Sequence, residues 1–159
     1  MSSKSTKKDK FSWMDSQQLG RILRELPAFA GVFAVDTLPN SVTSYPSAYV
    51  INSDILGGPG IHWMAIYFEQ TGKGHFFDSY GRHPSIYNLT SFLDVNSSTW
   101  TYNVKCIQST LTFVCGAYCV YFLLMKSAGV NEWLEPFGSN LILNDCIVLD
   151  FVKRFADVE

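Results

Sequence analysis

Apolar side chains recur every three or four positions near the start of the chain, which is the spacing of one face of a helix. Asp15 followed by Gln18 has the arrangement of a capping box, and Pro27 cannot continue the helical pattern. The pattern therefore predicts a helix that begins after Asp15 and buries one row of residues: Leu19, Ile22, Leu23 and Leu26.

Three later segments rich in β-branched and aromatic residues predict strands: 47–52, 61–69 and 75–79. The stretch DILGGPG predicts a turn between the first two, and TGKG makes a tight reversal that joins the last two into a hairpin. Residues 99–107 alternate weakly and predict another core strand, whereas 31–40 predicts a loop with short extended pieces.

The remaining pattern predicts three more helices. A short helix over 84–93 begins at a proline, and an almost continuous apolar run predicts a buried helix over 115–128 that ends at a glycine. Asn144 or Asp145 is expected to cap the last helix, whose apolar face consists of Ile147, Val148, Phe151, Val152 and Phe155. Hairpin-connected strands with helices grouped around them indicate an α+β fold, a small mixed or antiparallel sheet packed against helices.

The chain has 159 residues, of which 47% are hydrophobic, and a formal net charge of −2. This length suits one domain, and this charge gives no general affinity for nucleic acid or anionic membranes. Residues 1–12, in contrast, contain four lysines and one acidic residue. They predict a disordered basic tail, with at most a weak nucleic-acid contact, ahead of a single domain at 13–159.

Other sequence features bear on location and metals. No apolar signal segment follows the lysines, and no window has the ~18 apolar residues of a membrane span, so we expect an intracellular monomer without membrane contact. Reduced thiols are expected inside cells, and the cysteine spacing matches no zinc pattern, so no metal is expected. The cysteines are Cys106, Cys115, Cys119 and Cys146.

Four polar residues fall at the edges of predicted elements: His62, Asp78, Gln108 and Cys115. His62 begins one strand of the hairpin and Asp78 ends the other, so the imidazole and the carboxylate can meet. Gln108 follows the strand at 99–107, and Cys115 begins the buried helix, where the helix dipole favours a thiolate.

These residue types compose an acyl-transfer site. A free thiol, with a reference pKa of ~8.5, is mostly protonated at neutral pH, so it needs a base such as His62. Asp78 would orient the imidazole. The Gln108 side chain and the Cys115 amide would bind the oxyanion, and each such donor is worth ~3 kcal/mol in the transition state.

Two neighbours of this set are expected to contact substrate. Trp63 follows the histidine, and its indole would narrow the cleft to small residues beside the scissile bond. Gly116 follows the cysteine and would let the substrate backbone approach. Taken singly, each site residue has a structural explanation, such as a buried core cysteine or an Asp-Gly turn. Their combination at element edges favours chemistry.

The order His, Asp, Gln, Cys resembles the adenovirus-protease clan of cysteine proteases, which also contains the SUMO-specific proteases. The chain is most similar there to the adenovirus protease (adenain) family and its relatives in Polinton/Maverick elements and adintoviruses. The motifs GGPGIHWMAIYF, HFFDSYG and QSTLTFVCGAYC carry the resemblance, which covers about 15–156. The seven-residue step from Gln108 to Cys115 also looks like adenain.

The resemblance implies an adenain-like fold with a central buried helix that starts at the catalytic Cys115. It implies a thiol endopeptidase that cleaves viral or element-encoded capsid-type precursors next to glycine, in a Met/Ile/Leu-x-Gly context, in the host nucleus or the virion. His62, Asp78 and Gln108 take the roles given above, although the best-known adenain has Glu where this chain has Asp78.

Adenain is activated by a viral peptide, through a disulfide, and by DNA. This sequence has no cysteine at the matching distance before Gln108, and its folded part is not strongly basic, so no cofactor is expected. Two alternatives remain open: an isopeptidase of the same clan acting on the Gly-Gly tail of SUMO or ubiquitin-like proteins, and a binding module without catalysis. The second would lack a site residue, and none is missing here.

Overall fold

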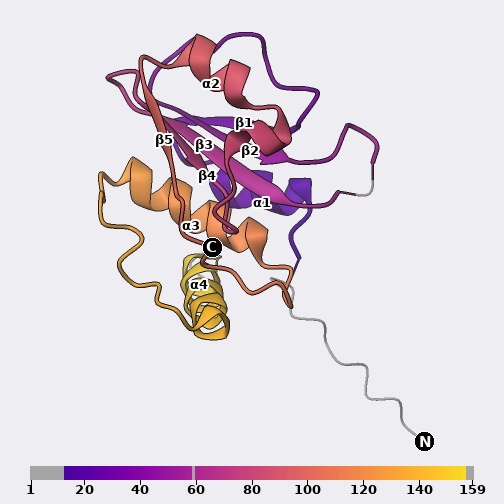
Figure 1. The fold of residues 1–159 in the computed structure, drawn as a ribbon, viewed down its shortest axis with the longest axis vertical. Helices are drawn as coiled ribbons and strands as arrows, with labels where there is room; N and C mark the ends of the chain where they lie inside the picture. Colours follow the sequence, from indigo (N-terminus) through magenta and orange to yellow (C-terminus); the bar gives the residue numbers. More distant parts are fainter. Residues whose placement is uncertain (1–12, 59, 157–159) are drawn as a thin grey trace, which may run out of the picture.

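The computed structural model describes residues 13–58 and 60–156, which form a five-stranded mixed sheet with helices on both faces (Figure 1). The strands lie in chain order: β1 Phe29–Ala34, β2 Ser47–Asn52, β3 Trp63–Phe68, β4 Gly74–Phe77 and β5 Trp100–Tyr102. The two outer pairs are parallel, and the two inner pairs are antiparallel. The helical elements are α1 Ser16–Leu23, the 3-10 turn η1 Pro84–Tyr87, α2 Thr90–Asn96, α3 Cys115–Ser127 and α4 Leu141–Ala156.

The two central strands are buried on both faces because each face of the sheet has its own hydrophobic cluster. Ala48 and Val50 of β2 belong to the cluster that also contains α1, α3 and α4. Tyr49 and Ile51, which alternate with them, point to the cluster under η1 and α2. The sheet is therefore the middle layer of three.

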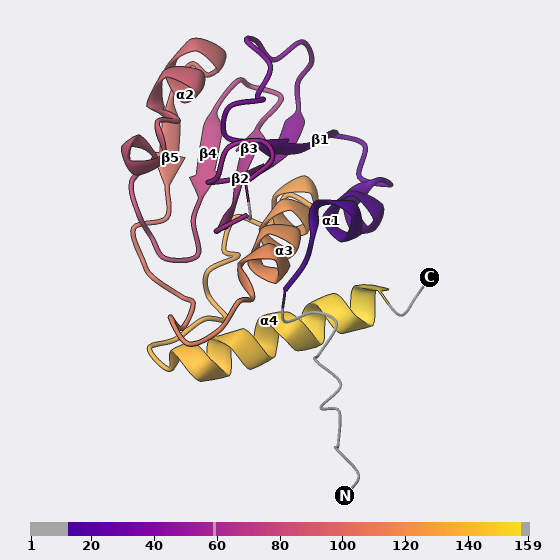
Figure 2. The ribbon, with the colours of Figure 1, turned by 90° about the vertical axis from the view of Figure 1, so that its right-hand side faces the viewer.

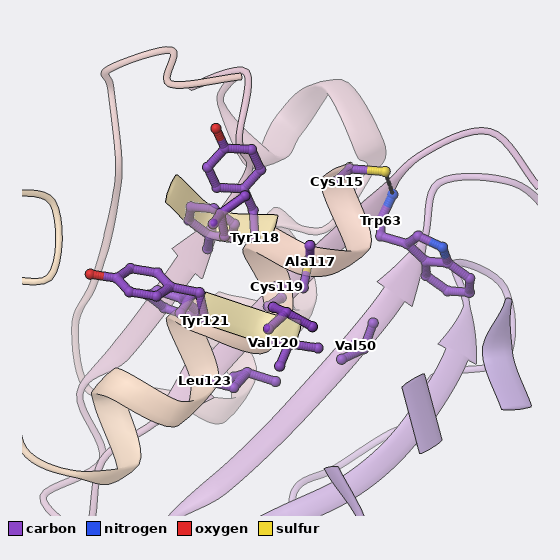
Figure 3. Packing of buried hydrophobic residues seen from close by; sticks show 14 of the residues in the cluster. Val50, Trp63, Cys115, Ala117, Tyr118, Cys119, Val120, Tyr121 and Leu123 are labelled. Carbon is purple, nitrogen blue, oxygen red and sulfur yellow. Dashed lines mark hydrogen bonds between the residues drawn. The ribbon is translucent and has the colours of Figure 1, made fainter. Parts of the chain in front are cut away.

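α3 is the most enclosed helix among the described residues. It contacts β3 on one side and α4 on the other, and α1 lies beside it (Figure 2). A helix covered in this way is apolar around its whole circumference, and Figure 3 shows Tyr118, Val120 and Leu123 packed among their neighbours. This burial fixes the first residue of α3, Cys115, against the first residue of β3, Trp63.

The structure confirms the α+β class and several local predictions. Asp15 caps α1, and its side chain and that of Gln18 form the reciprocal bonds of a capping box at 2.8 and 3.0 Å. The strand at 47–52 and the β3–β4 hairpin are also present. The adenain-like fold stays a prediction, and the basic tail at 1–12 lies outside the described residues.

The structure differs most from the predicted elements at the following places. Part of 31–40 forms β1, an edge strand with a bulge between Phe29 and Gly31. Only 100–102 of the strand at 99–107 pairs, because its partner β4 is short. The helix at 84–93 is interrupted at Asn88, whose backbone is left-handed with φ 57°, so η1 ends there and α2 begins later.

The last helix also begins earlier than predicted. α4 starts at Leu141, and the Asn140 side chain accepts the backbone N–H of Leu143 at 3.1 Å in the manner of an N-cap. Asn144 and Asp145, the predicted caps, lie inside the helix and are buried. No helix in the described part of the chain combines the length and apolar character that a membrane crossing requires.

Candidate active site

The ends of the hairpin bring His62 and Asp78 together. His62 directly precedes β3 and Asp78 directly follows β4, and the antiparallel pairing of these strands sets the two residues side by side. The Nε2 atom of His62 lies 2.7 Å from Oδ1 of Asp78. Both side chains are buried, so this contact is shielded from solvent.

The Asp78 carboxylate receives a full set of donors. The backbone N–H of Tyr80 donates to Oδ1 at 2.9 Å, and the Tyr87 hydroxyl donates to Oδ2 at 2.5 Å. Asn103 anchors the main chain of Asp78, whose N–H donates to Oδ1 of that amide at 3.0 Å. Burial alone would raise the pKa of Asp78, but the bonds from His62, Tyr87 and the Tyr80 backbone lower it below its ordinary value.

The surroundings of the His62 imidazole favour its protonated form. Its ring stacks on that of Tyr80, with 4.8 Å between centroids and an interplanar angle of 25°. Burial would lower the pKa of His62, but its hydrogen bonds with Asp78 and Cys115 and their charges raise it to about 9. The ring therefore joins a carboxylate on one side to a sulfur atom on the other.

Cys115 is the first residue of α3 and is 3% exposed. Its Sγ accepts the backbone N–H of Trp63 at 3.4 Å, the contact drawn in Figure 3. No side chain among the described residues caps α3, so the positive end of the helix dipole faces this sulfur without a competing acceptor. An amide, an imidazole and a helix end thus surround one thiol, which is the environment of a nucleophilic cysteine.

Gln108 is held by the residue that follows Asp78. The Ser79 hydroxyl donates to Oε1 of Gln108 at 2.5 Å, and the Ser79 carbonyl accepts the Gln108 backbone N–H at 3.2 Å. The Nε2 group of Gln108 donates to the Thr112 carbonyl at 3.3 Å, in the loop that leads to Cys115. Gln108 is fully buried, and one N–H of its two-proton amide is left by these bonds.

A buried carboxylate on α4 supports this loop. Oδ2 of Asp145 accepts the Thr112 hydroxyl at 2.7 Å, and its Oδ1 accepts the Tyr118 hydroxyl at 2.7 Å. Asn144, next to it, donates to the Ile107 carbonyl at 3.1 Å. The two residues that we expected to cap α4 therefore tie the helix to the segment between Gln108 and Cys115.

Trp63 and Gly116, the predicted substrate contacts, pack against Met14, which lies just before α1. The Trp63 indole N–H donates to the Met14 carbonyl at 2.8 Å. A Cβ atom on Gly116 would lie 3.2 Å from Cβ of Met14 and 3.4 Å from Cδ1 of Trp63. The need for glycine here comes from close packing of α3, which differs from the backbone approach that we had expected; substrate contact by either residue stays a prediction.

A cavity of about 330 Å³ opens beside Trp63. Its walls come from the segment before α1, from β1, and from the glycine-rich turn after β2. Representative lining residues are Trp13, Val32, Phe33, Asn52, Leu56 and Gly60. The volume and mixed lining fit a peptide side chain or a small ligand, and Trp63 is the lining residue that also contacts the Cys115 sulfur, through its backbone N–H. The described residues contain no group of three or more His, Cys, Asp or Glu side chains able to hold a metal ion.

Sequence reasoning missed the residues that support the site. Ser79 could have been found, because it follows Asp78 at the same strand end. Tyr87 and Asp145 gave no local signal, because their partners Asp78 and Tyr118 are reached only by tertiary packing. The roles assigned to the four predicted residues stay predictions, although the structure places His62 against both Asp78 and Cys115.

Comparison with known proteins gives a distant sequence relative. No known protein-family profile matches the chain. A protein of Acanthamoeba polyphaga mimivirus named "Putative thiol protease R355" is 29% identical over 107 residues, covering 61% of this chain and 33% of that protein. The chain thus spans about a third of the length of this relative.

Among solved structures, the central domain of an uncharacterised Legionella pneumophila protein superposes with a TM-score of 0.46. The sequence identity is 14%, and the match covers 91% of this chain and 98% of that domain. This likeness is too distant to bear on fold family or function.

Proposed function

We propose that this chain is a cysteine peptidase with Cys115 as its nucleophile. The observation that carries the proposal is the position of the His62 imidazole, whose Nε2 lies 2.7 Å from the Asp78 carboxylate and which interacts electrostatically with the Cys115 thiol. The similarity to a viral protein named as a thiol protease supports the same class. The site geometry and the sequence comparison are independent observations.

The reaction begins with attack by the Cys115 sulfur on the carbonyl carbon of a peptide bond. His62 holds the thiol proton as an imidazolium, stabilised by Asp78, and gives it to the leaving amine as the C–N bond breaks. This leaves a thioester on Cys115. Water then attacks the thioester, His62 takes its proton and returns it to the sulfur, and the carboxylic acid product leaves.

Charge on the carbonyl oxygen needs donors during both steps. The remaining N–H of the Gln108 amide and the backbone N–H of Cys115 at the uncapped start of α3 are the proposed donors. Ser79 supports this orientation, because its hydroxyl occupies the oxygen end of the Gln108 amide and leaves the nitrogen end toward the loop before Cys115. The donors are thereby fixed before substrate binds.

The proposed substrate is a polypeptide, cleaved at an internal bond next to glycine. The cavity beside Trp63 offers room for a side chain of such a peptide, and Trp63 connects this cavity to the Cys115 sulfur through its backbone N–H. The family resemblance adds capsid-type precursor proteins of a virus or mobile element as the biological substrate, and the mimivirus relative is in keeping with a viral setting.

The decisive experiment compares two substrate sets. The first is fluorogenic peptides that carry Leu-x-Gly, and the second is ubiquitin-like proteins whose C-terminal Gly-Gly is fused to a fluorogenic reporter. Wild type should cleave the first set, and Cys115→Ala should reduce the rate by at least ~10³-fold while remaining folded by circular dichroism. Cys146→Ser, which changes an exposed cysteine on α4, is the matched control and should keep full activity.

If the wild-type protein prefers the Gly-Gly fusions, the proposed function changes from an endopeptidase to an isopeptidase that uses the same mechanism. Persistent cleavage by Cys115→Ala would remove Cys115 as the nucleophile. Absence of cleavage in every substrate set, with Cys115 no more reactive toward iodoacetamide than Cys146, would favour a binding module.

A further inference from the structure

A second cavity, of about 350 Å³, lies between the β4–β5 edge of the sheet and the C-terminal half of α3. It shares no lining residue with the cavity beside Trp63. Lys73, His75 and Lys126 contribute basic groups to its wall, and Thr101 and Asn131 contribute a hydroxyl and an amide. None of these residues takes part in the peptidase chemistry proposed above.

Lys126 is the feature of this cavity that needs an explanation. It sits in the last turn of α3 and is 8% exposed, although lysine is almost never buried without a partner. Within the described part of the chain, no hydrogen bond and no ion pair within 4 Å is made by its ammonium. Burial lowers the pKa of Lys126, Glu69 partly offsets this effect, and the charge of Lys73 adds to it.

Among the described residues, the acidic side chain whose charge acts on Lys126 is Glu69, and it already contacts another member of the cluster. Oε2 of Glu69 lies 3.1 Å from Nε2 of His75, and Nδ1 of His75 lies 3.4 Å from the Thr101 hydroxyl. Glu69 is therefore held beside His75, and among the described residues it forms no ion pair within 4 Å with Lys126. Lys73 and Lys126 both line the cavity and give its wall an excess of positive charge.

The rest of the wall is apolar and aromatic, formed by Phe76, Tyr102, Phe122, Trp133 and Leu134. Such a surface does not suit a hydrated inorganic ion, because aromatic side chains gain stabilisation when they pack against the apolar part of a ligand. We propose that this cavity binds a small organic anion, in which a phosphate or carboxylate group pairs with the Lys126 ammonium and an apolar portion packs on the aromatic wall.

One lining residue of this cavity also contacts the candidate active site. Asn103 lines the cavity, and its amide holds the main chain of Asp78 through bonds to both the N–H and the carbonyl of that residue. The proposal concerns binding alone, however, and stands whether or not the chain is a peptidase.

Isothermal titration calorimetry on the full chain tests the proposal. Phenyl phosphate and benzoate supply the two anionic groups on an aromatic body, and benzyl alcohol supplies the body without charge. At least one anion should bind roughly tenfold more tightly than benzyl alcohol, since a charge-assisted hydrogen bond is lost in the neutral probe. The tighter of the two anions identifies whether the site prefers phosphate or carboxylate.

The variant Lys126→Met keeps the apolar stem and removes the charge, so it should fold and lose about tenfold or more in affinity for the preferred anion. Arg24→Met is the charge-matched control; Arg24 is exposed and pairs with its neighbour Glu25, and its loss should leave affinity unchanged. Equal binding of benzyl alcohol, unchanged affinity in a folded Lys126→Met, or no heat from either anion would overturn the proposal.

Discussion

The Ser79 hydroxyl donates a 2.5 Å hydrogen bond to Oε1 of Gln108, and both side chains are buried. Ser79 directly follows Asp78, which contacts His62. One dipeptide at the end of β4 therefore positions the group that orients the imidazole and the amide that we propose as an oxyanion donor. Because Asp78 and Ser79 are neighbours in the chain, the His62 imidazole and the Gln108 amide that they hold are positioned relative to each other.

Ser79→Ala should lower kcat by about tenfold while changing KM little, because the Gln108 amide would lose the bond that fixes its rotation. The buried Oε1 atom would also be left unsatisfied, at a cost of ~1–3 kcal/mol in the free energy of unfolding. Steady-state kinetics on the cleaved peptide, together with urea unfolding, measures both effects.

Ser97→Ala is the matched control for Ser79→Ala. The Ser97 hydroxyl donates to the Leu93 carbonyl on α2, remote from Gln108. This variant should lose stability with kcat preserved. Equal losses of kcat in both serine variants would show that the effect of Ser79→Ala comes from general destabilisation.

The raised pKa of His62 predicts how stability depends on pH. Its folded-state pKa is about 9, above the ordinary 6.5, so the charged ring contributes stability that is complete below pH 6.5 and is lost as pH rises through about 9. The free energy of unfolding should fall across this window, and the fall should be smaller in His62→Gln. Urea titrations from pH 6 to 9.5 measure the difference, and identical slopes would contradict the charged His62.

Local pattern was sufficient for the parts of the fold whose partners are close in sequence. The capping box at Asp15 and the β3–β4 hairpin depend on residues a few positions apart, so their signals survive in the chain alone. β1 was missed because it is an edge strand with incomplete burial and a bulge at Gly31, which removes the alternation that marks a strand.

The start of α4 shows why composition can mislead. Asn144 and Asp145 have the residue types of helix caps, but both are buried and bond to the segment 107–118. These hydrogen bonds form only when the folded segment 107–118 lies beside α4, and no local sequence pattern predicts that contact. The same holds for Tyr87 at Asp78, whereas residues at strand and helix ends, such as His62 and Cys115, could be proposed from the sequence.

Tyr87→Phe should destabilise the chain in a pH-dependent way. The Tyr87 hydroxyl helps to lower the pKa of Asp78, so the ionised carboxylate contributes stability above its ordinary pKa of 3.8 that is lost as pH falls through the lower folded value. The variant should lose ~1.5–3 kcal/mol at neutral pH, the value of a hydrogen bond to a charged group, and this deficit should shrink below pH 4.

Tyr45→Phe provides the comparison for Tyr87→Phe. The Tyr45 hydroxyl donates to the backbone carbonyl of Asn96, a neutral acceptor that does not titrate. The loss in the free energy of unfolding caused by Tyr45→Phe should therefore stay constant between pH 3 and 7. A constant deficit for Tyr87→Phe as well would show that its bond to Asp78 does not affect the carboxylate charge.

Gly116→Ala and Gly20→Ala should change stability in opposite directions. Gly20 lies inside α1 with no atom within 4 Å of the position of an added Cβ, so alanine there should stabilise by up to ~1 kcal/mol through helix propensity.

At Gly116 the added atom would lie 3.2 Å from Cβ of Met14, which has little freedom to move, and overpacking costs ~1–3 kcal/mol. Because the Met14 carbonyl also accepts the Trp63 indole, and the Trp63 backbone N–H donates to the Cys115 sulfur, Gly116→Ala should lower kcat as well. Urea unfolding and peptide cleavage of the two variants measure both quantities, and stabilisation by Gly116→Ala would refute the close packing of α3 on the segment before α1.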